Sequence, residues 1–199
     1  MDKETIVIAR YNEDLHWCLP FIELVKIYNK GKDNLDYIPK NRIQKCENLG
    51  KEGETYIKFI IENYDNLPKF KIFLQGHPFD HIDKNNKRKA YRDLINIIKE
   101  RKPYKFKYIS SWLVDVYPEF VDQYMHGLTT ITELFGGKEN LKNRFKKGYK
   151  YGSGALFVVH KDQILKHSKE FWNELNSHLQ EVNPNSGYGL EKLWRYLFE

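Results

Sequence analysis

The stretch FLQGHPFDH, residues 73 to 81, places two histidines and an aspartate directly after a short apolar run. Imidazole nitrogens and carboxylate oxygens are among the side-chain groups that most often transfer protons or bind metal ions. The apolar run is typical of a buried strand. A cluster of such polar groups at the end of that strand indicates a functional site.

Asp80 is the best single carboxylate in this stretch for Mn²⁺ or Mg²⁺, because hard cations prefer oxygen ligands. His77 or His81 would join it, since imidazole suits the softer transition metals. The structural alternative is that the His-Pro and Asp-His turns only satisfy backbone groups at the strand end. A metal-dependent hydrolase that uses these three side chains is a further alternative, although no additional His or Asp ligand motif accompanies them.

A second candidate site lies at Gly50 and Lys51, which precede the most regular amphipathic segment of the chain. Backbone N–H groups at the start of a helix favour an anion, and a neighbouring lysine reinforces them. Lys51 therefore predicts an anion site, and the alternative is an exposed lysine that only begins the helix. Glu52 and Glu54 suit the first turn through the helix dipole, which favours a structural role for both.

The elements that must hold these side chains alternate between strands and helices. Apolar runs bounded by turn residues predict buried strands at 4–10, 24–31, 69–75 and 153–160. A periodicity of 3.6 residues predicts amphipathic helices at 52–68, 88–101, 162–180 and 188–198. Of the remaining segments we expect 108–117 to be extended, 32–45 to be a loop and 118–147 to mix helix and loop.

This alternation predicts one domain, residues 1–199, with an α/β fold: a three-layer sandwich whose mainly parallel central sheet is flanked by helices. Ligands of such sheets bind beyond the carboxyl ends of the strands. The rule brings three polar segments to the same edge of the sheet, because each follows a predicted strand: RYNED, YNKG and QGHPFDH.

Several segments resemble a known family. IVIARYNEDLHW, from residue 6, is similar to the opening of glycosyltransferases of the GT-A type, in which a first strand runs into a Tyr-Asn-Glu loop. The stretch 47–81 closely resembles a less-characterised GT-A-like family. It has that family's Asn-x-Gly-(Arg/Lys)-Glu helix start, Asn-Tyr-Asp-Asn-Leu-Pro turn and Gln-Gly-His-Pro-Phe strand end. The tail fits as well, so the resemblance extends from residue 6 to residue 198.

The resemblance implies a GT-A-like fold and an enzyme that moves a sugar from a nucleotide-diphosphate-sugar donor to a hydroxyl of a carbohydrate or glycoconjugate acceptor. It places donor-binding groups at Arg10, Asn12, Glu13, Lys51, Gln75 and His77. Asn12 has the alternative role of a helix cap. Lys51 and Arg10 would face the diphosphate, and Mn²⁺ or Mg²⁺ would bind at Asp80 and His81. The sequence departs from the family in one respect, since it has no Asp-x-Asp at this strand end.

Glu191, in GYGLEKLW, resembles the acid that many GT-A enzymes place just before an amphipathic helix. An inverting transferase needs a general base that removes the proton of the acceptor hydroxyl, and the resemblance assigns this role to Glu191. Asp115 is the reserve candidate. The structural alternative for Glu191 is a helix-start carboxylate paired with Lys192 or Arg195.

The net charge of +6 is spread unevenly. Residues 84–107 carry ten Lys or Arg against two acids, and residues 138–150 carry six against one, so the rest of the chain is net negative. Such basic segments predict an anionic ligand or surface, with solvated helix faces as the alternative. A nucleic-acid-binding protein is the second function considered. It would stack bases on Tyr91, Tyr104, Phe106 and Tyr108, but no nucleic-acid-binding motif supports it.

The remaining features concern location and the tryptophans. No apolar stretch reaches the roughly 18 residues that a membrane-spanning helix needs, and the N-terminal segment lacks the pattern of a signal peptide. The two cysteines have neither metal-site spacing nor a disulfide framework, so we expect a cytoplasmic location. Trp112, Trp172 and Trp194 offer rings for sugar stacking, but the last two fall on apolar stripes that predict core positions.

Overall fold

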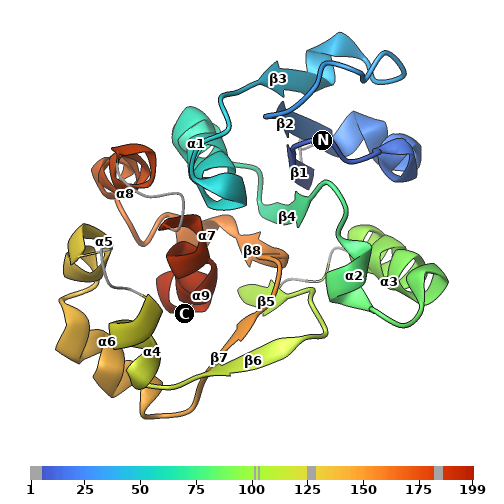
Figure 1. Cartoon of the computed structure of the whole chain (residues 1–199). Coiled ribbons are helices and arrows are strands. Elements are labelled where there is room, and N and C mark those ends of the chain that lie inside the picture. Colours follow the sequence, from blue (N-terminus) through green and yellow to red (C-terminus); the bar gives the residue numbers. More distant parts are fainter. Residues whose placement is uncertain (1–5, 101, 103, 125–128, 182–185) are drawn as a thin grey trace.

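The computed structural model describes residues 6–100, 102, 104–124, 129–181 and 186–199. Residues 4 and 5 of the predicted first strand lie outside this set. A six-stranded sheet occupies the middle of the molecule, and a two-stranded ribbon lies beside it (Figure 1).

The six-stranded sheet has the order β3-β2-β1-β4-β8-β5. Its strands are β1 (Ile6–Arg10), β2 (Val25–Asn29), β3 (Ile43–Lys45), β4 (Phe70–Gln75), β5 (Phe106–Tyr108) and β8 (Phe157–His160). The pairs among β3, β2, β1 and β4 are parallel, whereas β8 runs antiparallel to both β4 and β5. The prediction of an α/β fold with a mainly parallel sheet is therefore confirmed.

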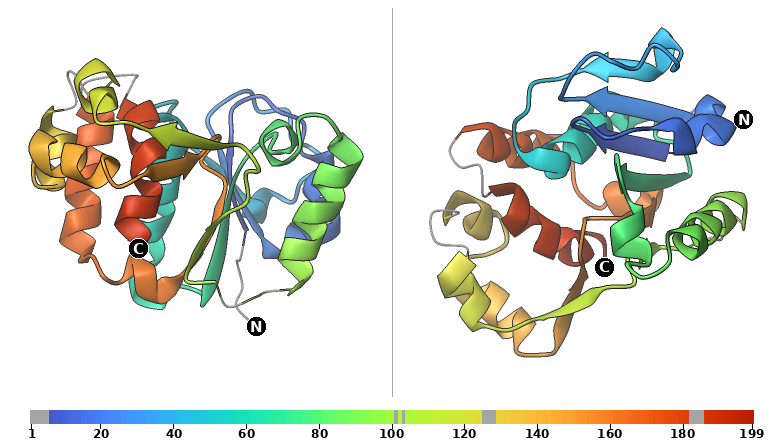
Figure 2. Two further views of the ribbon diagram at one scale, coloured as in Figure 1. Left: turned by 90° about the horizontal axis from the view of Figure 1, so that it is seen from below. Right: turned by 45° about the vertical axis from the view of Figure 1, so that its right-hand side comes forward.

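The two faces of the sheet are covered by different helices, which gives three layers (Figure 2). On one face lie α1 (Lys51–Asn63), α8 (Lys169–Glu181) and α9 (Ser186–Phe198). The other face packs on the 3-10 helix η1 (His16–Leu24) and on α3 (Lys87–Glu100). Along β1 the side chains alternate between the two cores, since Val7 belongs to the first and Ile8 to the second.

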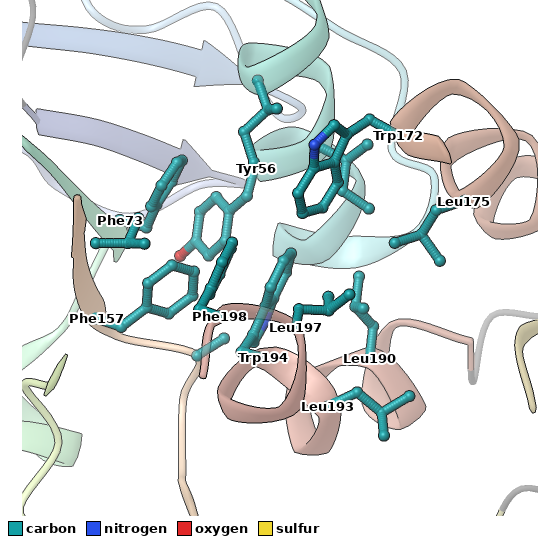
Figure 3. Packing of buried hydrophobic residues seen from close by; sticks show 14 of the residues in the cluster. Tyr56, Phe73, Phe157, Trp172, Leu175, Leu190, Leu193, Trp194, Leu197 and Phe198 are labelled. Carbon is teal, nitrogen blue, oxygen red and sulfur yellow. The ribbon is translucent and has the colours of Figure 1, made fainter. Parts of the chain in front are cut away.

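The larger core is dominated by aromatic rings (Figure 3). Trp172 and Trp194 are completely buried, which confirms that they are core residues. The indole of Trp194 stacks on Phe198, with ring centroids 5.7 Å apart, and also packs against Tyr56. Truncating such a ring to alanine typically costs about 3–5 kcal/mol. This cluster therefore fixes α9 against α1 and the sheet.

Helix α1 begins and packs as its periodicity predicts, because Ile57 and Ile60 are buried against the sheet. It ends at Asn63, earlier than expected, and residues 64–66 form a separate 3-10 turn, η3 (Tyr64–Asn66). Pro68 follows this turn, and a proline cannot continue a helix.

Several predicted segments differ from the structure. The expected loop 32–45 contains the 3-10 turn η2 (Lys40–Arg42) and the edge strand β3, which is short and only half-buried. The extended segment 108–117 is split between β5 and β6 (Leu113–Val116). β6 pairs with β7 (Tyr149–Gly152) in the ribbon, a strand that the sequence did not predict.

The expected helix 162–180 is two helices, α7 (Lys161–Ile164) and α8. Two side-chain hydrogen bonds stabilise the break between α7 and α8, and the spacing of apolar residues in the sequence does not reveal them. His167 Nε2 lies 2.9 Å from the carbonyl oxygen of Leu197, and Trp172 Nε1 donates to the carbonyl oxygen of Ile164.

The segment 118–147 and the end of β4 supply the remaining helices. Three of them, between β6 and β7 in the chain, are α4 (Glu119–Tyr124), α5 (Thr129–Leu134) and α6 (Lys138–Phe145) (Figure 1). Helix α2 (Phe79–Ile82) follows β4. No helix in the described part of the chain is long and apolar enough to cross a membrane.

Candidate functional site

A cavity of about 210 Å³ opens at the carboxyl ends of the central strands. Its walls come from the ends of β1, β2 and β4, the loop after β1 and the start of α1. The lining residues are Ala9, Arg10, Tyr11, Glu13, Lys30, Asn48, Lys51, Glu52 and Gln75. Strand order changes direction between β1 and β4, because β2 and β3 lie to one side of β1 and β4 lies to the other. The cavity is therefore at the topological switch point, where ligands of such sheets bind.

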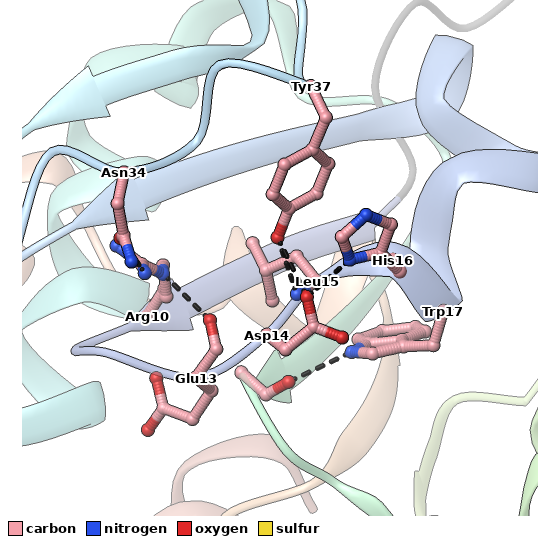
Figure 4. A network of polar contacts seen from close by, with 9 residues as sticks. Arg10, Glu13, Asp14, Leu15, His16, Trp17, Asn34 and Tyr37 are labelled. Atoms are coloured by element: carbon pink, nitrogen blue, oxygen red, sulfur yellow. Dashed lines mark hydrogen bonds and ion pairs between the residues drawn. The ribbon is translucent and has the colours of Figure 1, made fainter.

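Arg10 is buried at the end of β1, and its guanidinium points into the protein (Figure 4). It donates to the carbonyl oxygen of Glu13 and to Oδ1 of Asn29 at 2.9 and 2.7 Å. It also donates to the carbonyl oxygen of Lys32 and to Oδ1 of Asn34, both at 2.6 Å. These bonds join the loop after β1 to the loop after β2, so the geometry supports a positioning role for Arg10 rather than contact with a diphosphate.

Glu13 links the loop after β1 to the end of β4. Its Oε2 accepts hydrogen bonds from the backbone N–H groups of Tyr11 and Asn12, at 2.7 and 3.1 Å. A Cβ atom on Gly76 would lie only 2.6 Å from that same oxygen, so the close approach needs glycine there. Asn12 does not cap a helix, since its Oδ1 accepts from the backbone N–H of Lys32. The two predicted donor-binding residues thus shape the loop that borders the cavity.

The outer part of the same loop is held by a polar network around Asp14 (Figure 4). His16 Nδ1 lies 2.5 Å from Oδ1 of Asp14, and the Tyr37 hydroxyl donates to the same oxygen. The hydrogen bond with His16 is the main reason that the pKa of Asp14 is lowered. Tyr37 also accepts from the backbone N–H of Leu15, just before η1 begins. Trp17 fixes the other side by donating to the carbonyl oxygen of Gly76.

The floor of the cavity contains a buried ion pair. Lys30 Nζ lies 2.7 Å from Oε2 of Glu54, and both side chains are almost completely buried. The same ammonium group donates to the carbonyl oxygens of Leu49 and Lys51, each at 2.5 Å. Lys30 therefore attaches the end of β2 to the first turn of α1, which sets the position of the residues that begin the helix.

Lys51 lines the cavity and has an unusual backbone. It and Gly50 both have left-handed conformations, with φ of 53° and 54°. Its ammonium group lies 3.5 Å from the centroid of the Tyr188 ring, a cation–π contact. Among the described residues no carboxylate pairs with it, so its charge is available to an anion in the cavity.

Glu52 is the carboxylate at the start of α1 that lines the cavity, and its side chain is half-buried. Burial raises its pKa, and the charge of Glu191 raises it further, while a hydrogen bond from Gln75 opposes the shift. The sequence favoured a helix-dipole role for Glu52. The signal that could have identified Glu52 as a site residue is its position directly after Lys51, at the edge of the sheet where ligands were expected to bind.

Glu191 lies inside α9, and both of its carboxylate oxygens are engaged. Oε1 accepts a 2.6 Å hydrogen bond from the backbone N–H of Gly154, and Oε2 lies 3.2 Å from Lys192 Nζ. The residue is only 9% exposed. It does not line the cavity described above, but its charge acts on Glu52, which does. The pairing with Lys192 matches the structural alternative.

The GSG turn after β7 contacts α2. Ser153 Oγ lies 3.2 Å from Nδ1 of His81, and a Cβ atom on Gly154 would lie 2.5 Å from Cγ of the same imidazole. Gly154 has a φ of 87°, which also favours glycine. This turn therefore separates His81 on one side from Glu191 on the other.

The proposed metal ligands do not converge in the structure. Asp80 is exposed, and its oxygens lie 3.6 Å from His77 Nδ1 and 3.6 Å from Lys87 Nζ. His81 is directed to the GSG turn instead. Within the described ranges, no three His, Cys, Asp or Glu side chains come together as a metal site. Asp115, the reserve base, is an exposed residue of the ribbon that pairs with Lys150 at 3.2 Å.

A protein-family model matches almost the whole chain. A family described as "Protein of unknown function (DUF3431)" matches residues 6–199. Searches of curated proteins and of solved structures returned no match. The matched range includes every strand of the central sheet and all the residues that line the cavity. The chain therefore belongs to the DUF3431 family.

Proposed function

We propose that this protein is a GT-A-like glycosyltransferase that moves a sugar from a nucleotide-diphosphate-sugar donor to a hydroxyl of a carbohydrate or glycoconjugate. The observation that carries the proposal is the polar cavity at the switch point between β1 and β4. It combines one available cation with one carboxylate of raised pKa. The sequence resemblance described above supports the same assignment.

The donor diphosphate would lie at the start of α1. Lys51 supplies a positive charge there, and the first backbone N–H groups of the helix favour an anion. Both would stabilise the negative charge that develops on the leaving diphosphate. Tyr11, which lines the cavity and is 51% exposed, offers a ring face to the base or the sugar.

The acceptor hydroxyl needs a base. In the proposed reaction a carboxylate oxygen takes the hydroxyl proton, the hydroxyl oxygen bonds to the anomeric carbon, and the bond from that carbon to the diphosphate breaks. This in-line displacement inverts the anomeric centre. Glu52 lines the cavity and would serve as this base. Glu191 does not line the cavity, but its negative charge acts on Glu52. A carboxyl with a raised pKa is a better base near neutral pH than an ordinary one.

A divalent cation bound to the donor would supply further positive charge to the leaving group. The described residues do not form a complete metal centre, because Asp80 is an isolated exposed carboxylate and His81 faces Ser153. In the proposed reaction, Lys51 and the start of α1 are therefore the protein groups that stabilise the leaving diphosphate.

The two other functions considered receive no specific support. A nucleic-acid-binding surface would need exposed rings, but Tyr91, Phe106 and Tyr108 pack against the cores, and Tyr104 is half-buried with Lys107 over its ring. A metal-dependent hydrolase would need His77, Asp80 and His81 to share a ligand, and they do not converge.

A thermal-shift panel tests the proposal. A ligand that binds the native state raises the melting temperature by mass action. We expect uridine or guanosine diphosphate, and a sugar derivative of one of them, to raise it, whereas the free nucleosides should not. Lys51→Gln should lose the shift, and Lys40→Gln, a control at an exposed lysine of η2, should keep it. A panel in which no nucleotide changes the melting temperature of the wild-type protein would exclude the proposed donor class.

A further inference from the structure

Helix α3 carries a stripe of basic side chains on the side opposite its buried residues. Ala90, Leu94 and Ile98 face the core. Arg88, Arg92 and Lys99 recur at intervals close to whole helical turns on the exposed side, and Lys84 precedes them.

The charge of this stripe is not neutralised within the described part of the chain, where no ion pair forms to any of its four members. Neighbouring lysines behave differently. Lys87 lies near Asp80, and Lys89 pairs with Asp83 and Asp93. The exposed face of α3 is therefore net positive along its length.

Two large exposed apolar side chains lie between β5 and the first residue of β6, in a segment that contacts α2. Trp112 is 57% exposed and Leu113 is 49% exposed, although both are of types that are usually buried. Their backbone is held in place, because the N–H of Ser111 donates to the carbonyl oxygen of His81 and the N–H of Trp112 donates to Ser110 Oγ. His81 belongs to α2, so the loop between β5 and β6 lies against that helix (Figure 1).

The basic stripe and the apolar pair therefore both lie next to α2. Helix α2 contacts α3, and Asp80 of α2 lies near Lys87 at the start of α3. We define the interfacial surface as Lys84, Arg88, Arg92, Lys99, Trp112 and Leu113.

We propose that the interfacial surface docks the protein on an anionic lipid bilayer. Basic side chains are attracted to the negative surface of such a bilayer, and tryptophan prefers the headgroup region, where its ring is partly apolar and partly polar. Leu113 adds apolar area that can enter the acyl boundary. None of the six residues lines the cavity, so this proposal and the proposed enzymatic function can fail separately.

The chemistry favours a bilayer over a nucleic acid. Base stacking along a strand needs several aromatic rings on the basic face, but Trp112 is the single exposed ring of the interfacial surface, and Tyr91 on α3 packs into the core. The exposed pair at residues 112 and 113 includes an aliphatic side chain, which gains little from phosphate or bases but gains from an acyl boundary.

Vesicle co-sedimentation of the full chain tests this inference. The probes are phosphatidylcholine vesicles with and without phosphatidylserine. We expect binding only when phosphatidylserine is present. The triple variant Lys84→Gln/Arg88→Gln/Arg92→Gln should partition roughly 100-fold more weakly, since each basic residue near the surface contributes about one kcal/mol. The matched variant Lys40→Gln/Lys146→Gln/Lys147→Gln removes three exposed charges elsewhere and should bind as the wild type does.

Trp112 provides a second readout. Its emission should shift to shorter wavelength on binding, and the shift should be absent in Trp112→Phe. Because the replaced side chains are exposed, all variants should keep the wild-type melting temperature. Three results would overturn the inference: equal binding to vesicles of both compositions, an equal loss in the two triple variants, or binding to a single-stranded oligonucleotide without binding to vesicles.

Discussion

The backbone N–H of Gly154 donates a 2.6 Å hydrogen bond to Glu191, while the missing side chain of Gly154 leaves room for the imidazole of His81. One glycine therefore connects α2, the ribbon and α9. Its φ of 87° and the close imidazole restrict this position in two independent ways.

We expect Gly154→Ala to destabilise the protein by about 2–5 kcal/mol. A left-handed backbone costs an alanine roughly 1–2 kcal/mol, and the overlap with His81 adds about 1–3 kcal/mol. Gly148→Ala is the matched control, because Gly148 has a φ of 79° with open space around it, so only the backbone cost applies. Urea denaturation measures both variants, and equal losses would show that the contact with His81 contributes nothing.

Glu52→Gln and Glu191→Gln separate the two candidate bases. Gln keeps the volume of Glu but cannot accept a proton at neutral pH. If Glu52 is the base, Glu52→Gln should lower the rate of sugar transfer by about 10²- to 10⁴-fold and leave donor affinity unchanged. Glu191→Gln should then have a smaller effect on turnover. The opposite order of the two rates would restore the assignment of Glu191.

The Glu52→Gln variant also has a pH signature. In the folded protein the pKa of Glu52 is raised, mainly by burial. Its contribution to stability is therefore fully present below the unfolded pKa and is lost as the pH rises through the folded pKa. Glu52→Gln should remove this loss, which melting curves across that pH range will detect. Turnover should instead rise through the folded pKa, because the base must be deprotonated.

Lys51→Gln should weaken the binding of a nucleoside diphosphate by about 10- to 100-fold, the range expected for a lost hydrogen bond to a charged group. Titration calorimetry measures the affinity. Lys40→Gln should leave it unchanged, because Lys40 is exposed and outside the cavity. A wild-type affinity in Lys51→Gln would remove Lys51 from the site.

Donor binding should be tighter with Mn²⁺ than with a chelator if a divalent cation completes the site. Asp80→Asn should then weaken binding in the presence of Mn²⁺ and have no effect in the presence of the chelator. Asp83→Asn, which alters a neighbouring carboxylate that pairs with Lys89, is the control. Equal affinities with Mn²⁺ and chelator would leave Lys51 and the helix start as the groups that stabilise the charge.

The buried pair under the cavity gives a prediction on stability. Glu54→Gln leaves the charge of Lys30 buried without its carboxylate, and breaking such pairs typically costs about 3–5 kcal/mol. Asp122→Asn breaks the exposed pair with Lys142 and should change stability little. Chemical denaturation compares the two. A small effect of Glu54→Gln would mean that the carbonyl oxygens of Leu49 and Lys51 suffice to hold the ammonium group.

Periodicity and strand-end chemistry predicted much of the frame. β1, β2 and β4 were found because each is a short apolar run, and α1 and α9 because their apolar stripes are regular. The rule for parallel sheets then brought the segments after β1, β2 and β4 to one edge, where the cavity lies. Lys51 was identified for the same reason, since it begins a clear helix at that edge.

The orientation of side chains was not predictable in the same way. Arg10 is basic and lies at the expected edge, but its partners Asn29, Lys32 and Asn34 come from the end of β2 and the loop after it, so the sequence could not show that its guanidinium is engaged. β3 and β7 were missed because short, half-exposed strands have no clear alternation. The predicted helix 188–198 already contained Glu191, whereas the start of α9 at Ser186 was missed because small and polar residues give no clear start signal.

The bonds of Arg10 have a consequence for the energetics of binding. Because they tie the loop after β1 to the loop after β2, those loops already have the geometry that borders the cavity before any ligand enters. A ligand there would order little additional chain, so the conformational entropy lost on association would be small. Arg10 would then increase affinity by preorganisation, without touching the ligand, and its replacement would act mainly on the unbound protein.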